Sequence, residues 1–184
     1  KITKEWHPTK NGELKPSDFP CGSNKKVWWK CPKGDDHEWK TVISGRTRGA
    51  GCPYCSGNRV SKDNNLLAVH PDVAKQWHPT KNGELKPSDF TSGSKKKVWW
   101  KCPKGGDHEW KAGVQERSRG QGCPYCSNKK VSKDNNLLAM YPKVAKEWHP
   151  TKNGKLKPSE VVAGSHEKVW WKCPKGDDHE WKTS

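Results

Sequence analysis

The sequence predicts small α+β modules in tandem rather than one globular domain. Trp6, Trp77 and Trp148 lie 71 residues apart, which indicates one structural unit used repeatedly. Only 29% of the 184 residues are hydrophobic, yet the chain holds 12 tryptophans and 8 cysteines. Units with so little apolar material bury a small core and need a disulfide or metal staple to fold.

Each complete unit contains three cysteines and a histidine at one fixed spacing. The candidate ligands are Cys31, His37, Cys52 and Cys55 in the first unit and Cys102, His108, Cys123 and Cys126 in the second. Thiolate and imidazole suit tetrahedral Zn²⁺, which is structural when four protein ligands close its coordination sphere. Disulfides and a redox Cys-x-x-Cys are the alternatives, but the βαβ pattern of a redox fold is absent. The set favours zinc in a reducing compartment inside the cell: cytoplasm, nucleus or an organelle interior.

The third unit supplies only half of this ligand set. It has Cys173 and His179 but reaches Ser184 before any Cys-x-x-Cys pair. We therefore predict two structural zinc sites and an incomplete third. We place the zinc repeats at residues 1–62, 63–133 and 134–184, the last of them truncated. The chain starts at Lys1 without methionine, and we expect it to be a piece of a longer protein.

The histidine ligand has an alternative at this stage. A second histidine also recurs in every unit, as His7, His78 and His149. We favour His37 and His108 because they follow the first cysteine on the same turn. In the alternative, the earlier histidine binds the metal or packs in the core. Cys21 has no counterpart in the other units and is excluded as a ligand.

The zinc knuckle is predicted at the turn of a β-hairpin. Residues Lys25–Lys30 have the best strand pattern, and Glu38–Val42 should return beside them. Adjacent residues of a strand point to opposite faces. One of Trp28 and Trp29 should therefore enter the small core beside Trp6 and Trp39, and the other should face outward or cover a neighbouring unit.

Less regular structure follows the hairpin. Gly45–Gly51 is predicted to be a glycine- and arginine-rich loop, and Cys52–Cys55 a short helical turn opened by its proline. A short helix is expected from about Asn65 to Gln76, broken by Pro71.

The charge points to a polyanionic partner. The chain carries 36 basic and 20 acidic residues, a net charge of +16. Such an excess attracts nucleic acid, although a merely solvated basic surface is the plainer interpretation. Arginine beside glycine suits phosphate contact. The candidate contacts are Arg46, Arg48, Arg59, Lys62, Arg117, Arg119, Lys129 and Lys130. No stretch is apolar enough to span a membrane, and no catalytic constellation is present, so we do not expect an enzyme.

Several phrases carry a family resemblance over nearly the whole chain. They are Glu-Trp-His-Pro-Thr-Lys-Asn-Gly, Val-Trp-Trp-Lys-Cys-Pro-Lys-Gly, His-Glu-Trp and Gly-Cys-Pro-Tyr-Cys. They resemble a family of tandem treble-clef, probable zinc-ribbon repeats, long labelled a domain of unknown function. The resemblance implies a zinc knuckle, a β-hairpin and a short helix in each unit. It also implies nucleic-acid binding, since the family often stands beside domains similar to very-short-patch-repair endonucleases.

These observations predict zinc-stabilised, treble-clef-like repeats that bind nucleic acid through its phosphate backbone, with DNA slightly favoured over RNA. The alternative is a structural or adaptor subunit that docks onto a large protein or ribonucleoprotein assembly.

Overall fold

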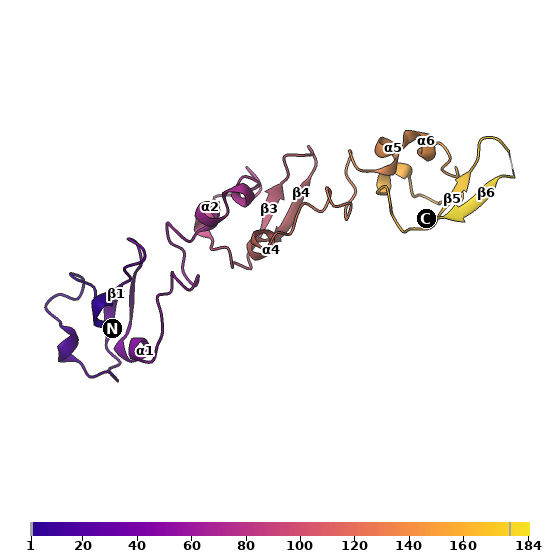
Figure 1. Ribbon diagram of the computed structural model, residues 1–184. Coiled ribbons are helices and arrows are strands. Elements are labelled where there is room, and N and C mark those ends of the chain that lie inside the picture. Colours follow the sequence, from indigo (N-terminus) through magenta and orange to yellow (C-terminus); the bar gives the residue numbers. More distant parts are fainter. Residues whose placement is uncertain (1, 177) are drawn as a thin grey trace. The chain divides into compact units, whose positions relative to one another are not determined.

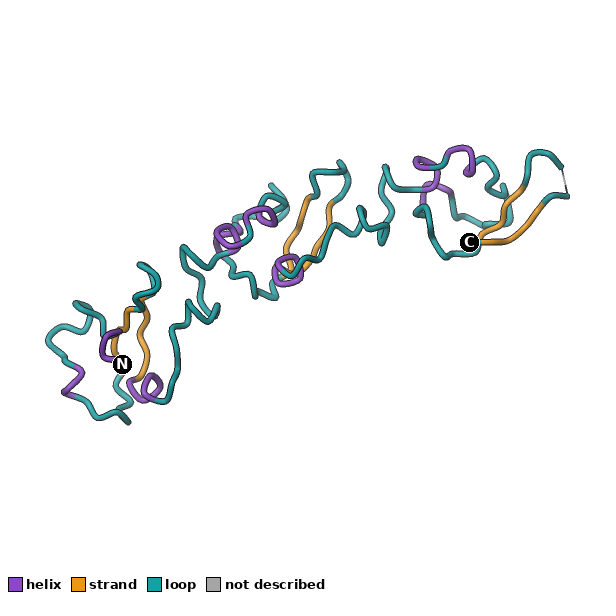
Figure 2. The backbone as a smooth tube through the Cα atoms, viewed as in Figure 1, coloured by secondary structure: helices purple, strands orange, loops and turns teal. Residues whose placement is uncertain are grey.

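The computed structural model describes residues 2–176 and 178–184. It contains three two-stranded sheets, one in each repeat (Figure 1). The chain divides into two compact units: the residues up to Val98 with Gly113–Arg119, and Trp99–Ala112 with the residues from Gly120 onward. Loops and turns join short helices and strands throughout (Figure 2). This architecture confirms repeated small units of a hairpin and short helices.

The predicted hairpin of the first repeat is confirmed. Strand β1, Lys26–Lys30, pairs antiparallel with β2, Glu38–Val42, with Trp29 opposite Trp39. The other hairpins are β3 (Lys97–Lys101) with β4 (Glu109–Gly113), and β5 (Val169–Lys172) with β6 (Glu180–Thr183). Valine and tryptophan favour these strands because their bulky side chains pack well on a pleated surface.

The core of the first repeat lies on one face of its hairpin. Trp29 and Trp39 are 1% and 3% exposed, and the ring of Trp6 meets that of Trp29 edge-on at 5.6 Å. Trp28 points to the other face, where the ammonium of Lys10 lies 4.9 Å from its ring centroid. The prediction that one of these adjacent tryptophans enters the core and the other faces outward is therefore confirmed.

The predicted loop at Gly45–Gly51 is wrong in its first part. Helix α1, Ile43–Thr47, begins directly after β2, and its equivalent α4 is Val114–Ser118. Ile43 is buried, and its N–H donates to the carbonyl of Lys25 at 3.1 Å. This tertiary anchor outweighs the weak helical preference of a glycine-containing segment. The helix ends before Gly49, which has φ of +98°.

The predicted break at Pro71 is confirmed. Helices α2, Leu66–Val69, and α3, Pro71–Ala74, replace one longer helix, and the side chain of Asn65 caps α2 by accepting from the N–H of Ala68. The equivalent pair is α5, Leu137–Met140, and α6, Pro142–Ala145. Short 3-10 helices lie at η1 (Ile2–Glu5), η2 (Pro16–Asp18), η3 (Pro87–Asp89) and η4 (Pro158–Glu160).

Candidate metal centres

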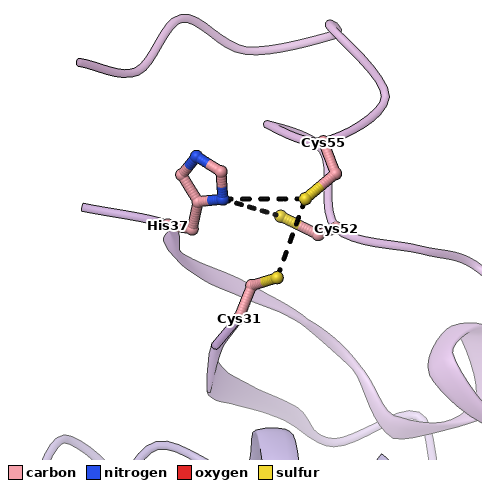
Figure 3. A group of neighbouring side chains, drawn as sticks. All are labelled: Cys31, His37, Cys52 and Cys55. Carbon is pink, nitrogen blue, oxygen red and sulfur yellow. Dashed lines mark hydrogen bonds between the residues drawn. The ribbon is translucent and has the colours of Figure 1, made fainter. Parts of the chain in front are cut away.

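The first candidate metal centre joins the end of the hairpin to a later turn. Cys31 follows β1 directly, and its N–H donates to the carbonyl of His37 at 3.0 Å, which closes the knuckle. Cys52 and Cys55 come from the turn that follows α1. Figure 3 shows these three sulfur atoms and one ring nitrogen of His37 converging on a common point. The proline-containing segment Cys52–Cys55 forms a turn, held by a 3.1 Å bond from the N–H of Ser56 to the carbonyl of Cys52.

The distances in this cluster fit a tetrahedral zinc ion. The Sγ atoms of Cys31 and Cys55 are 3.7 Å apart, and Nδ1 of His37 lies 3.8 Å from Sγ of Cys52 and 3.7 Å from that of Cys55. All four ligand atoms lie within 4.8 Å of one another. Two sulfurs bound at about 2.3 Å to one tetrahedral ion stand about 3.8 Å apart. A disulfide needs about 2.05 Å between its sulfurs, and all 8 cysteines are free thiols.

The protonation of the thiols also fits a cation. Burial, together with the contacts that Cys55 makes with the thiols of Cys31 and Cys52, raises the pKa of Cys55 to about 12. Burial opposes ionisation of Cys31 as well, but hydrogen bonds from Lys33 N–H, His37 and the neighbouring thiols outweigh it and lower the pKa. Three thiols this close cannot all ionise unless a positive charge lies among them. A divalent ion would supply that charge and hold all three as thiolates.

The outward nitrogen of the His37 ring has its own partner. Its Nε2 lies 2.9 Å from Oδ1 of Asp63, and that carboxylate also accepts from Ser61 Oγ at 2.6 Å. An acceptor at Nε2 keeps the proton on that nitrogen, so Nδ1 presents its lone pair to the thiols. A metal-binding histidine oriented by a carboxylate in this way is a common arrangement in zinc sites.

Two further contacts fix the His37 ring. Tyr54 stacks on it at 5.0 Å between centroids and 11° between planes, and its hydroxyl donates to the carbonyl of Glu38 at 2.8 Å. On the knuckle side, a Cβ at Gly34 would lie only 2.6 Å from the His37 ring. The glycine of the Cys-Pro-Lys-Gly phrase is therefore needed because the imidazole occupies the space that a side chain would fill.

The second cluster repeats the first. The Sγ atoms of Cys102 and Cys126 are 3.7 Å apart, and Nδ1 of His108 lies 3.8 Å and 3.6 Å from the Sγ atoms of Cys123 and Cys126. Nε2 of His108 lies 2.8 Å from Asp134. The predicted pair of Cys3His clusters that could bind zinc is thus confirmed. In each cluster an equivalent aspartate orients the histidine.

The alternative histidine lies outside these clusters. Nδ1 of His7 accepts from the backbone N–H groups of Thr9 and Lys10 at 3.3 Å and 3.1 Å, and Nε2 lies 3.2 Å from Glu38. The ring is 4% exposed and both nitrogens face protein groups. Of the two roles considered for His7, metal binding and packing, the structure therefore supports packing.

The third repeat has the knuckle without its second pair of thiols. The N–H of Cys173 donates to the carbonyl of His179 at 2.9 Å, as in the complete repeats. The side chain of His179 is 58% exposed, whereas that of His37 is 3% exposed. Among the described residues, this repeat lacks a full cluster.

The structure separates the predicted phosphate contacts into two kinds. Arg46 and Arg117 are buried, and the Arg46 guanidinium lies 5.3 Å from the ring centroids of both Trp29 and Trp39. Burial removes these two arginines from the side chains that can reach a phosphate. The exposed ones are Arg48, Arg59, Lys62, Arg119, Lys129 and Lys130.

Several residues of the centres were missed by the sequence analysis. Asp63, Ser61 and Tyr54 had no metal-site role in the sequence analysis. The signal was present, since Ser-Lys-Asp-Asn-Asn recurs after each Cys-Pro-Tyr-Cys phrase, at Ser61 and Ser132. It did not identify a metal-site partner because Asp63 is 26 residues from His37 and only folding brings them together.

A hairpin knuckle and a Cys-Pro-Tyr-Cys turn that converge on one point define a zinc-finger repeat protein. The chain belongs to the family described as the probable treble clef zinc finger domain, whose sequence model matches it three times, at residues 2–58, 73–129 and 144–184. No curated protein matches the chain. Within the described part of the chain, no helix has the length and apolar character needed to cross a bilayer.

Proposed function

We propose that these zinc-built repeats bind nucleic acid through its phosphate backbone, with DNA slightly favoured over RNA. The observation that carries the proposal is the distribution of a +16 net charge. Among the described lysines and arginines, only Arg46 and Arg117 are buried. The rest of this basic charge lies at the surface, where it attracts a polyanion and releases the counterions bound to it.

The exposed basic side chains recur near each zinc cluster. Arg48 follows α1, and Arg59 and Lys62 follow the Cys-Pro-Tyr-Cys turn. Arg119 and Lys130 occupy comparable places in the second repeat. The zinc cluster holds the turn that lies between Arg48 and Arg59, so folding fixes the backbone from which these exposed side chains project.

The proposed role includes no catalytic step. Each complete cluster offers four protein ligands, and a zinc ion held by all four has no position for water or substrate. Zinc would supply structural stability, because metal binding to such a small module adds directly to its folding free energy.

A salt titration with a matched pair of variants tests the proposal. Affinity for duplex DNA, single-stranded DNA and RNA is measured by fluorescence anisotropy at several salt concentrations. We expect a steep loss of affinity with salt, and the double variant R48Q/R119Q should reduce the slope of log K against log salt by about 1–2. The control K75Q/K146Q changes the same number of charges beside the α2–α3 and α5–α6 pairs and should leave the slope nearer its original value. Absence of binding, or binding insensitive to salt, would overturn the proposal.

An adaptor role is the second candidate, favoured by exposed apolar side chains on the helix pairs. Leu67 and Leu138 are 53% and 50% exposed, and Met140 and Tyr141 are each 52% exposed. Such residues can form the centre of a protein interface. Salt-insensitive capture of one protein, without affinity for nucleic acid, would favour this candidate.

A further inference from the structure

The aspartate that orients the first zinc-binding histidine stands on a short segment, residues 61–66, which we call the strap. One end of the strap is bound to the first candidate metal centre. Asp63 contacts Nε2 of His37 at 2.9 Å, and the N–H of Lys62 donates to Oδ2 of Asp36, the residue before His37, at 2.8 Å. The backbone of the strap therefore sets the position of the carboxylate that holds the imidazole.

Two asparagines give the strap a fixed shape. The side chain of Asn64 donates to the carbonyl of Tyr54, the residue stacked on the zinc-binding histidine, at 2.7 Å. The side chain of Asn65 donates to the carbonyls of Ser61 and Lys62 at 2.8 Å and 2.9 Å. Asn65 is 8% exposed, so breaking these bonds would leave buried polar groups unpaired. A displacement at one end of the strap is therefore transmitted to the other.

The other end of the strap is attached to the second repeat. Leu66, the first residue of α2, is fully buried, and its N–H donates to the carbonyl of Phe90 at 2.8 Å. Asn65 forms an isolated antiparallel bridge with Thr91. Phe90 follows η3 directly, and its ring lies 5.7 Å from that of Trp77. Only three positions along the chain thus separate the carboxylate that serves the first centre from a buried residue bonded to the second repeat.

The junction between the second and third repeats has the same bonds, made by the equivalent strap, residues 132–137. The N–H of Leu137 donates to the carbonyl of Val161 at 2.8 Å, and Asn136 forms an isolated bridge with Val162. The side chain of Asn136 also donates to two backbone carbonyls of its own strap, at 2.8 Å and 3.0 Å. The arrangement is therefore a property of the repeat and not of one junction.

We propose that the strap couples each zinc centre to the folding of the repeat that follows it. Folding of the second repeat fixes Leu66, and the rigid strap then presents the Asp63 carboxylate to His37, which strengthens zinc binding at the first centre. By linkage, zinc at the first centre holds the strap and stabilises the attachment of α2 to the second repeat. The two centres therefore bind zinc with positive cooperativity, and the junctions add to the stability of the array.

A cycle of zinc affinities in the full chain tests this coupling. C123S/C126S leaves only the first centre able to bind zinc, C52S/C55S leaves only the second, and the parent binds at both. Competition with a chromophoric chelator gives each association constant. We expect the product of the parent's two constants to exceed the product of the single-site constants by about fivefold, the lower end of the usual coupling between two sites. Equal products would show independent centres and would overturn the proposal.

Substitutions at the anchor of the strap assign the coupling to this route. L66A removes the buried side chain that attaches the strap to the second repeat, and it should abolish the excess. L67A is the matched control, because Leu67 is on the same helix and 53% exposed, and it should keep the excess. The milder L66V retains most of the apolar volume, so it should fold and give an intermediate value. An excess that survives unchanged in L66A and L66V would contradict the role of the strap.

Hydrogen exchange gives a second readout in the same chain. With the first centre emptied by C52S/C55S, the amide of Leu66 should exchange about fivefold faster, because the same coupling free energy opposes its opening. The amide of Leu137 should keep nearly its original rate, since the second centre still holds its strap. Equal acceleration of both amides would indicate general unfolding, and an unchanged Leu66 amide would indicate no coupling. Either result would overturn the proposal.

Discussion

Nε2 of His37 lies 2.9 Å from Oδ1 of Asp63, while Nδ1 of the same ring faces the thiols of Cys52 and Cys55. The two ring nitrogens thus have different roles. The Asp63 carboxylate accepts the hydrogen bond from Nε2–H and so fixes the ring orientation, while Nδ1 keeps the lone pair that a zinc ion needs. The same relationship links His108 to Asp134 at 2.8 Å.

Replacing Asp63 by asparagine should weaken zinc binding at the first centre. We expect a loss of about tenfold, at the lower end of the range for such orienting groups, because the Asp63 side chain is 52% exposed. Competition with a chromophoric chelator measures it. D72N is the control, since that carboxylate is 90% exposed and pairs only with Lys75 among the described residues. Equal zinc affinities for D63N and D72N would contradict the role of Asp63.

Removal of zinc should unfold the first two repeats. Each of these repeats has a small core, and three of its buried groups are metal ligands. Loss of zinc therefore removes the charge that compensates the thiolates and the packing of the ligand side chains. Circular dichroism and tryptophan fluorescence after chelation measure the loss of structure.

Single cysteine variants assign this effect to a site. C52S should remove one zinc per chain and leave the second centre loaded. C21S should leave both, because Cys21 is exposed and lies outside the clusters. A chelated chain that keeps its native spectrum would show that the metal is not structural.

Replacing Gly34 by alanine should disturb the first centre without touching a ligand. The new Cβ would lie 2.6 Å from the His37 ring, so the ring must shift from its position beside the thiols. We expect weaker zinc binding at this centre alone. G22A has open space around its added Cβ and serves as the control. Zinc affinity that is the same in G34A, G22A and the parent would refute the close approach.

Replacing Arg46 by methionine should destabilise the first repeat. The substitution removes a buried cation from two tryptophan faces and leaves the Glu5 carboxylate without its partner. We expect a loss of about 1–3 kcal/mol in the free energy of unfolding, measured by denaturant titration of the zinc-loaded chain. R48M alters an exposed arginine and should change stability by less than about 0.5 kcal/mol. The reverse order of effects would place Arg46 at the surface.

Acid should weaken the third repeat through Glu180. Its carboxylate accepts from Lys152 and lies 2.9 Å from His149, and these contacts lower its pKa from 4.5 to about 2. Because the pKa is lower in the folded state, the stabilisation is complete above about pH 4.5 and is lost as pH falls toward 2. The variant E180Q should flatten the acid limb of a stability–pH curve. A limb of unchanged steepness would show that another group controls it.

The sequence alone determined the parts that depend on spacing and local chemistry. The 71-residue period, the two Cys3His sets and the hairpin around Val27 and Trp29 follow from residue order and alternation. The break at Pro71 follows from proline's missing N–H and fixed φ. None of these needs a contact between distant residues.

Tertiary structure alone decided the rest. Part of the predicted Gly45–Gly51 loop belongs to α1. Arg46 is buried against Trp29 and Trp39, so it is not available to contact a phosphate. Folding also joins Asp63 to His37 across 26 residues. Each of these outcomes depends on burial and on partners far away in sequence, and a local pattern carries no information about either.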